Sequence, residues 1–176
     1  MTEIEYSRAS EATTLCKECG LCCSGHLFSW VRLNARELTP LENMGISVIR
    51  SDPRQRGFLQ PCPLWNGECT IYGSHQYPRG CDSYNCKLLR ELLDESVSLQ
   101  KAIRVVRRAK ERMRKVEALL PPSSITCFRE RLVTHLESAN GLKNGETELD
   151  KKAYALVELY RDDFGVTDLL TSESLE

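Results

Sequence analysis

Long apolar runs are missing from this chain of 176 residues. None approaches the roughly 20 residues that a membrane-spanning helix needs, so we expect no membrane segment. Residues 1–8 also lack the apolar centre of a secretory signal. We therefore expect a cytoplasmic protein, in a reducing compartment where disulfides are rare.

A charge excess of either sign is missing as well, since 24 Lys and Arg residues face 25 Asp and Glu residues. Domains that bind nucleic acid are usually strongly basic, so nucleic acid is not an expected partner of the whole chain. The sequence contains no phosphate-binding loop, dinucleotide-binding fingerprint, nucleophile elbow or zinc-protease motif. No catalytic motif is recognisable, and the sequence assigns no catalytic residue.

Cysteine, in contrast, is abundant, with nine residues. Four thiols fall within the segment 16–23, and two pairs follow further along the chain. A C-x-x-C spacing lets two sulfurs of one tight turn reach the same ion, and Gly20 lets that turn adopt a positive φ. Clustered thiols in a reducing compartment are more often metal ligands than disulfides. We predict that eight cysteines are metal ligands: Cys16, Cys19, Cys22, Cys23, Cys62, Cys69, Cys81 and Cys86.

Thiolate is a soft ligand, which favours zinc, copper(I) or an iron–sulfur cluster over magnesium or calcium. Eight thiolates can fill two tetrahedral sites, or one site with bridging sulfurs. Because the consecutive residues Cys22 and Cys23 project in different directions, we expect them to serve different ions, or one of them to bridge. A zinc ion with four thiolates is saturated, so such a site is structural rather than catalytic. The remaining interpretations are a disulfide scaffold and a redox pair of Cys16 and Cys19.

Residues near the eight cysteines are expected to support the site. Cys127 is remote from the others, and we expect it to be a small buried apolar residue. His26 and His75 are close in sequence, but with eight thiols present a surface or supporting role is favoured over ligation. Three cations can offset the negative charge of bound thiolates: Lys17, Arg79 and Lys87. Three tyrosines are expected to pack over the site: Tyr72, Tyr77 and Tyr84.

The predicted fold is a small α+β fold in which residues 1–87 form a loop-rich, metal-stabilised cysteine-cluster domain. We expect short strands at 27–33 and 46–49, with a short helix at 34–43 between them. Residues 51–87 are rich in Pro, Gly, Asn and Ser and are expected to be a loop. A metal contributes roughly 10–16 kcal/mol of apparent folding free energy, which would replace the missing apolar core there.

Residues 88–170 are predicted to form a helical C-terminal region of about three helices, followed by a loose tail at 171–176. The first helix should run over 88–120, broken near Ser96 and Ser98, with one apolar residue in every seven: Leu92, Leu99, Val106, Met113 and Leu120. Pro121 and Pro122 end it. Ser123 or Ser124 is expected to cap a second helix that reaches about Asn140, where Gly141 begins a turn over 141–145.

A third helix is expected to begin at Thr147, with Asp150 completing a capping box, and to reach about Phe164 before Gly165. The segment 101–115 of the first long helix is basic. Such a segment can bind nucleic acid or an acidic partner, but it can equally be a solvated face balanced by the acidic residues before it. The C-terminal helices also offer a surface for a protein partner.

The cysteine pattern resembles that of a known family. Its elements are C-x-x-C-x-x-C-C at 16–23, Cys62-Pro-Leu, Gly-Glu-Cys69-Thr-Ile-Tyr, and the stretch from Pro78 to Cys86. Together they resemble the YkgJ-like cysteine-cluster proteins, described as zinc- or iron-chelating, over about residues 15–87. The resemblance implies that the same eight cysteines bind the metal. The sequence departs from the family around the seventh cysteine, where it has Tyr77 and Asp82 in place of arginines.

The leading interpretation is a metal-binding protein that chelates zinc or iron through eight cysteines, in a structural or scaffold site. The first alternative is an iron–sulfur protein in electron or methyl transfer. Methyl transfer enters only by analogy, because a similar cluster occurs in a flagellin lysine N-methylase. The second alternative is a nucleic-acid or protein interaction module that uses the basic segment 101–115.

Overall fold

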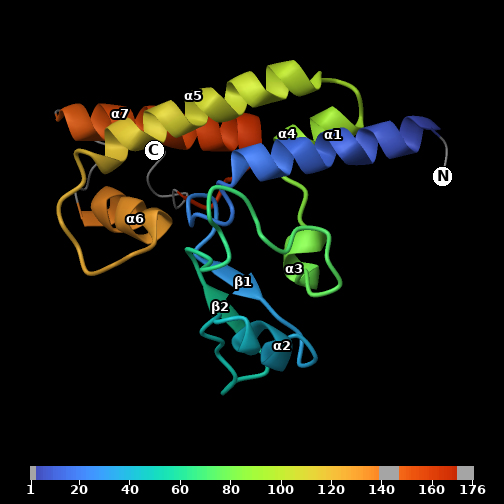
Figure 1. Ribbon diagram of the computed structural model, residues 1–176. Helices are drawn as coiled ribbons and strands as arrows, with labels where there is room; N and C mark the ends of the chain where they lie inside the picture. The colour runs from blue at the N-terminus through green and yellow to red at the C-terminus, as the bar shows by residue number, and fades with distance from the viewer. Residues whose placement is uncertain (1–2, 139–146, 170–176) are drawn as a thin grey trace.

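The computed structural model describes residues 3–138 and 147–169, which form a layer of helices with a smaller unit beneath it (Figure 1). The layer consists of α1 (Glu3–Cys19), α4 (Lys87–Leu93), α5 (Leu99–Glu117) and α7 (Glu148–Leu159). α5 contacts the other three helices, and α1 also contacts α4. α6 (Phe128–Ser138) packs against α7. The N-terminal helix is therefore part of the same layer as the C-terminal helices.

The smaller unit is built on two short antiparallel strands, β1 (Trp30–Arg32) and β2 (Gly57–Leu59). Val31 lies opposite Phe58 in this pair. The unit also contains α2 (Leu38–Asn43) and α3 (Arg79–Asp82), and α3 contacts β1 (Figure 1). Its own small core holds six buried side chains: Val31, Leu33, Leu38, Leu41, Ile46 and Phe58.

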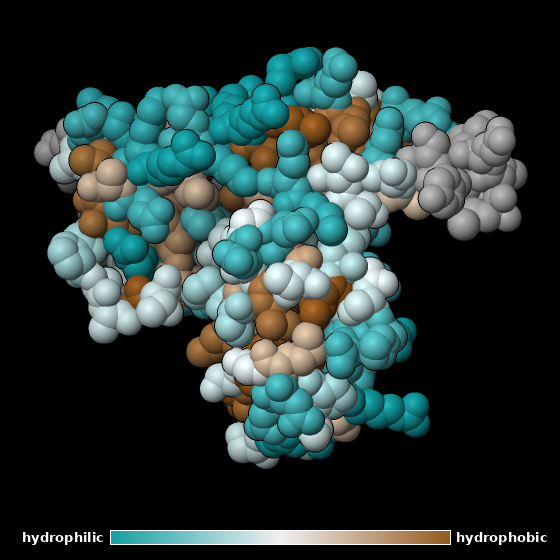
Figure 2. Space-filling model, in the orientation of Figure 1, coloured by the Kyte–Doolittle hydropathy of each residue, from teal (hydrophilic) through white to brown (hydrophobic). Residues whose placement is uncertain are grey.

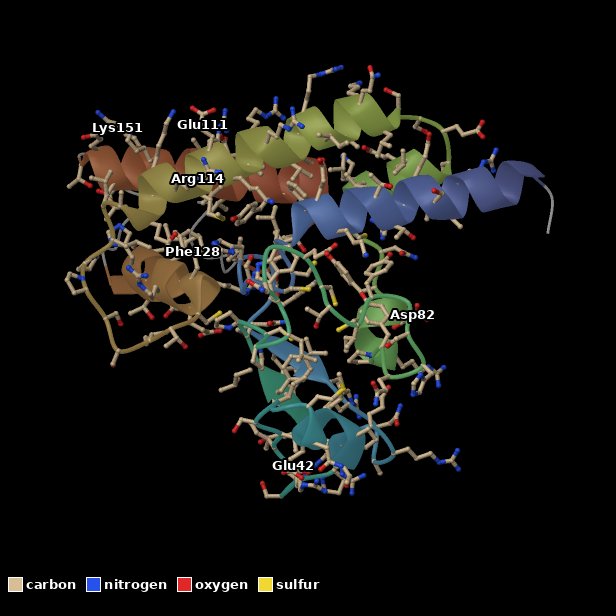
Figure 3. The ribbon with its side chains drawn as sticks, in the orientation of Figure 1. Glu42, Asp82, Glu111, Arg114, Phe128 and Lys151 are labelled. Carbon is tan, nitrogen blue, oxygen red and sulfur yellow. The ribbon has the colours of Figure 1, made fainter. Side chains whose placement is uncertain are left out.

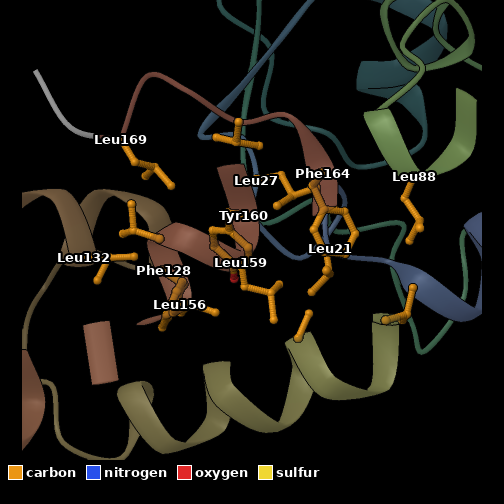
Figure 4. Close-up of a cluster of buried hydrophobic side chains, with 14 of the residues drawn as sticks. Leu21, Leu27, Leu88, Phe128, Leu132, Leu156, Leu159, Tyr160, Phe164 and Leu169 are labelled. Carbon is orange, nitrogen blue, oxygen red and sulfur yellow. The ribbon is translucent and has the colours of Figure 1, made fainter. Parts of the chain in front are cut away.

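The large core lies within the helical layer and at its junction with α6 (Figure 4). Tyr160 and Leu132 are completely buried, and Leu21 and Leu27 of the cysteine-bearing turn insert into the same cluster. Burying each large apolar side chain contributes about 1.5–3 kcal/mol. The turn that carries the first cysteines is therefore anchored by ordinary hydrophobic burial.

α5 has a polar outer face and an apolar inner face. Hydrophilic residues predominate along the edge of the molecule where α5 lies (Figure 2). The predicted apolar residues face inward: Val106 and Leu120 are buried, and Leu99 and Met113 pack against the same core. The predicted break before this helix is confirmed, because α4 ends at Leu93 and the side chain of Ser98 caps α5.

The start of α7 is confirmed as a capping box. The hydroxyl of Thr147 accepts a hydrogen bond from the Asp150 amide at 3.1 Å, and the Asp150 carboxylate accepts from the Thr147 amide at 3.2 Å. The helix continues as a π-helical turn, η1 (Tyr160–Phe164), to the predicted end. Gly165 then adopts φ 74, the left-handed conformation that terminates a helix without a Cβ clash.

The count of about three C-terminal helices is wrong, because the region contains α4, α5, α6, α7 and the π-turn η1. α6 begins at Phe128 and not at Ser123 or Ser124, because the Ser123 hydroxyl accepts from the Ile125 amide at 3.1 Å and closes a turn instead of capping a helix. The predicted helix end near Asn140, the turn at 141–145 and the tail at 171–176 lie outside the described residues.

Two predictions in the N-terminal half are also wrong. In the described part of the chain the segment 46–49 forms no strand, and Ile49 makes only an isolated bridge to Gly57. The second strand is β2, which lies with α3 inside the stretch expected to be a loop. A three-residue strand depends on its distant partner rather than on a local pattern, so the sequence offered no sign of it.

The short helix predicted at 34–43 begins at Leu38. Asn34 does not cap it, because the Asn34 amide instead donates to the Glu37 carboxylate at 2.8 Å.

No helix in the described part of the chain is long and apolar enough to cross a membrane. The division at residue 87 stays a prediction, and the structure adds only that α1 packs with the C-terminal helices.

Candidate metal centre

The first four cysteines lie where α1 ends. Cys16 and Cys19 are in the last turn of α1, and Gly20 follows with φ 62, as the sequence predicted. The Gly20 amide donates to the Cys16 carbonyl at 3.2 Å, and the Gly25 amide donates to the Cys22 carbonyl at 3.2 Å. These bonds fold the segment into a compact turn that presents several thiols on one side.

The loop that carries Cys62 and Cys69 lies directly against this turn. The amide of Cys62 donates to the carbonyl of Cys23 at 2.8 Å, and Trp65 forms a β-bridge with Cys69. The indole of Trp65 covers Gly20 so closely that a Cβ there would lie 1.9 Å from a ring carbon. Two segments far apart in sequence are thus held together by backbone and by a bulky aromatic side chain.

The last two cysteines come from two short helices, one in the smaller unit and one in the helical layer. Cys81 lies within α3, and Cys86 is the N-cap of α4. The sulfur of Cys86 accepts a hydrogen bond from the Leu89 amide at 3.4 Å. Such a bond favours the thiolate, which is the form that binds metals. Figure 3 shows sulfur atoms gathered between the helical layer and the smaller unit.

A cavity of about 100 Å³ lies among these segments, and seven of the eight predicted ligands line it. The exception is Cys62, which packs against the small core instead. Much of the remaining lining is apolar and includes Leu21, Phe28 and Phe164. The predicted tyrosines are confirmed as part of the wall: Tyr72, Tyr77 and Tyr84.

The thiols fall into two groups of four. The upper set packs against the large core and consists of Cys16, Cys19, Cys22 and Cys86. The lower set consists of Cys23, Cys62, Cys69 and Cys81. Cys62 and Cys81 pack against the small core, and Cys23 and Cys69 hydrogen-bond to each other. The groups meet between the consecutive residues Cys22 and Cys23.

Burial and mutual repulsion make most of these thiols hard to ionise. Burial raises the pKa of Cys16 to about 11 and that of Cys19 to about 12, with further upward contributions from Cys86. Burial likewise raises the pKa of Cys81 to about 12. At neutral pH these thiols therefore carry protons, which a soft cation would have to displace.

Cys23 and Cys69 form a tightly coupled pair. The thiol of Cys23 donates to Cys69, which lowers the pKa of Cys69 and raises that of Cys23. The positive charge of Lys17 contributes to the lowered pKa of Cys69. The first proton of the pair is therefore lost from Cys69, which gives the lower set one thiolate at a moderate pH.

The cations that act on the thiols are only partly those expected. Lys17 lowers the pKa of Cys69, as predicted, but Arg79 lines a different hollow. The Nζ of Lys87 donates to the Asp162 carbonyl at 2.7 Å, on the side of the layer where η1 lies. Burial raises the pKa of both Cys19 and Cys86, and two cations that the sequence did not suggest partly oppose it: Lys110 acts on Cys19 and Arg90 on Cys86.

The other predicted residues lie outside the cavity. Cys127 is buried, as expected, and its thiol lies 3.3 Å from the Gly25 carbonyl. His26 is buried and stacked on Phe128 at 4.6 Å, and burial lowers its pKa to about 4. His75 is exposed.

Sequence reasoning missed two residues of the cavity region. Gln60 is 4% exposed and lines the cavity, and its buried Oε1 has no hydrogen-bond partner among the described residues. Nothing in the local sequence marks this position. Trp65, which covers Gly20, is marked in the sequence as a large aromatic residue between Cys62 and Cys69.

Within residues 3–138 and 147–169, no three Cys, His, Asp or Glu side chains are arranged to hold a metal ion. The donor set is nevertheless chemically suited to a soft cation, because the cavity wall offers seven thiols with apolar and tyrosine neighbours. Ligation would require side-chain rotation about the cysteine Cα–Cβ bonds. No protein-family model matches the chain, and neither a curated protein nor a solved structure is significantly similar to it.

Proposed function

We propose that this protein binds zinc or iron through its eight clustered cysteines, and that the metal locks the smaller unit onto the helical layer. One observation carries the proposal: seven of these thiols line a single cavity although they come from separate parts of the chain. Four of them lie on the 16–23 segment, and the others come from the Cys69 loop, α3 and α4.

The upper and lower sets are proposed to be two separate four-thiolate sites. The upper set packs against the large core, and two residues of the lower set pack against the small core. Each set is therefore held by a different group of apolar side chains. Within the upper set, Cys86 raises the pKa of Cys16, Cys19 and Cys22. Within the lower set, Cys62 and Cys69 raise the pKa of Cys81. Repulsion also crosses between the sets, since Cys81 raises the pKa of Cys22. Four sulfurs in each set match the tetrahedral coordination of zinc.

A structural role follows from which elements the two sets join. The upper set links α1 to the start of α4, and the lower set links the 16–23 segment to the Cys62–Cys69 loop and to α3. A fully thiolate site has no open position for a substrate, so it stabilises the fold rather than catalysing a reaction. A cytoplasmic location and membership of the YkgJ-like cysteine-cluster family belong to the same proposal.

An iron–sulfur cluster is the second candidate, favoured by the surroundings of the upper set. Four cysteines with apolar neighbours such as Leu15 and Phe28 offer the ligand number that a cluster requires and shield it from solvent. Such a protein would act in electron transfer, or in methyl transfer by analogy with the methylase.

The deciding experiment is metal analysis of protein purified without oxygen. Zinc in a fixed ratio to protein, with a colourless solution, supports two structural sites. Iron together with acid-labile sulfide and a brown colour supports a cluster. The proposal fails if reduced, metal-free protein keeps residues 15–87 folded and takes up neither metal.

A further inference from the structure

A second hollow, of about 420 Å³, lies in the smaller unit beside the end of β1. Its wall differs from that of the cysteine cavity because it is dominated by charged and polar side chains. The charged and polar residues of the wall are Arg32, Asn34, Glu37, Arg56, Arg79 and Ser83. Three arginines and a single glutamate therefore line one small volume.

Within the described part of the chain, the carboxylate of Glu37 forms no ion pair with these arginines. Its Oε1 accepts from the backbone amide of Arg79 at 2.7 Å, and its Oε2 accepts from the amide of Asn34 at 2.8 Å. Glu37 is thus occupied with two backbone donors. Among the residues that the structure describes, the side chains of Arg32, Arg56 and Arg79 form no hydrogen bond or ion pair. The buried Nε of Arg56 is left without an acceptor.

Backbone contacts fix the spacing of the three arginines. Arg32 is the last residue of β1, and the amide of the next residue, Leu33, donates to the Arg56 carbonyl at 2.9 Å. Arg79 begins α3, which lies so close to β1 that a Cβ on Gly80 would be 2.7 Å from the Arg32 carbonyl. The three arginines therefore line the same hollow because the backbone segments that carry them are joined.

We propose that this hollow binds the phosphate group of a small phosphorylated molecule. Three guanidinium groups and one carboxylate leave a formal charge of +2, which suits a dianion. The planar, forked donors of arginine match the oxygens of phosphate, and such charge-assisted bonds are about twice as strong as neutral ones. The volume exceeds that of a single phosphate, which leaves room for the rest of the molecule. This site does not depend on the metal proposal.

Titration calorimetry with pyrophosphate at low salt tests the proposal on the full-length, reduced protein. We expect saturable binding that Arg56→Gln weakens at least about tenfold, because the variant loses charge-assisted hydrogen bonds to the phosphate oxygens. Arg79→Gln removes an exposed side chain and should weaken binding to a similar degree. Arg54→Gln is the matched control, because Arg54 is 90% exposed, pairs with Asp52 and lies outside the hollow.

Several results would overturn the proposal. One is the absence of heat of binding at millimolar pyrophosphate; another is an equal loss of affinity in Arg54→Gln, which would show diffuse attraction by surface charge. Succinate binding as tightly as pyrophosphate would refute phosphate selectivity. Arg79→Gln keeps the test decisive even if Arg56→Gln unfolds, and circular dichroism of each variant separates the two cases.

Discussion

Gly20 lies under the indole ring of Trp65, with no space for a side chain between them. A Cβ on Gly20 would be 1.9 Å from the ring, and the residue also adopts φ +62. This pair joins the turn that carries the first cysteines to the loop that carries Cys62 and Cys69. Its tight fit is independent of any metal.

Gly20→Ala should destabilise the protein and weaken metal binding. The left-handed backbone penalises a Cβ by about 1–2 kcal/mol, and the overlap with Trp65 adds roughly 1–3 kcal/mol. Gly67→Ala is the matched control, because Gly67 has φ +80 but a Cβ there meets nothing within 4 Å. Urea denaturation of both variants measures the difference. Equal loss of stability would show that the contact with Trp65 contributes nothing.

Single cysteine substitutions should separate the two sets. Cys86→Ser removes a proposed upper ligand and Cys62→Ser a proposed lower one. If the two sets are separate sites, each variant should retain about half of the cobalt(II) or zinc taken up by the parent protein. Cys127→Ser should bind the full amount, because Cys127 lies outside the cavity. Cobalt titration followed by absorbance gives the stoichiometry. Complete loss of binding in Cys86→Ser would indicate one shared site with bridging sulfurs.

The metal-free protein should lose stability at high pH. Burial raises the pKa of Cys16 and Cys19 from 9.0 to about 11 and about 12. A thiol with a higher pKa in the folded than in the unfolded protein contributes its full stabilisation of the fold at any pH below the unfolded-state pKa. This contribution is lost as the pH rises through the folded-state pKa. The metal-free protein should therefore lose stability between about pH 9 and pH 12. Melting temperatures measured across this pH range, with and without zinc, test this prediction.

Metal affinity should rise with pH, whereas the stability of the metal-free protein falls. Each bound thiolate must first lose its proton, so raising the pH favours binding. We expect zinc affinity to rise from pH 6 to pH 8, with proton release detectable in buffers of different ionisation enthalpy. Pairs of titrations in two such buffers give the number of protons. A flat pH profile would contradict thiolate ligation.

The cap of α7 should matter for stability but not for metal binding. Thr147→Ala removes the hydroxyl that accepts from the Asp150 amide, and losing an N-cap typically destabilises by about 1 kcal/mol. Thr147→Ser keeps the hydroxyl and should remain close to the parent protein. Melting temperature and zinc stoichiometry are the two measurements. A parallel loss of zinc in Thr147→Ala would contradict the expectation that this cap affects stability alone.

The basic segment 101–115 is partly engaged inside the molecule. Arg108 pairs with Asp163 at 2.6 Å, and Lys110 donates to the Glu18 carbonyl at 2.5 Å. Exposed cations such as Arg104 and Arg107 lie on the outer face of α5. Changing these two to Glu should leave folding and metal content intact. Salt-dependent binding of the parent protein to an oligonucleotide, lost in this variant, would support an interaction module instead.

Local chemistry could be predicted from sequence where neighbouring residues determine it. Thr147 and Asp150 are three residues apart and form their capping box within one helical turn. Gly165 ends its helix, and Ser98 begins another, for equally local reasons. The positive φ of Gly20 also follows from its place between Cys19 and Cys22.

Pairings between distant segments could not be predicted in the same way. β2 exists because Phe58 lies opposite Val31, and neither residue signals the other. The assignment of Cys86 to the same group as Cys16 depends on how α4 packs against α1. The arginine-lined hollow is also non-local, since Arg32, Arg56 and Arg79 come together only after β1, β2 and α3 assemble.

Cys22 and Cys23 belong to different sets, yet a single peptide unit joins them. Fixing the upper set orients the backbone from which Cys23 projects, and the Cys23 carbonyl in turn holds the amide of Cys62. Occupancy of one set should therefore lower the entropy loss of filling the other. Metal uptake would then be positively cooperative, with a sigmoidal titration in which half-loaded molecules are scarce.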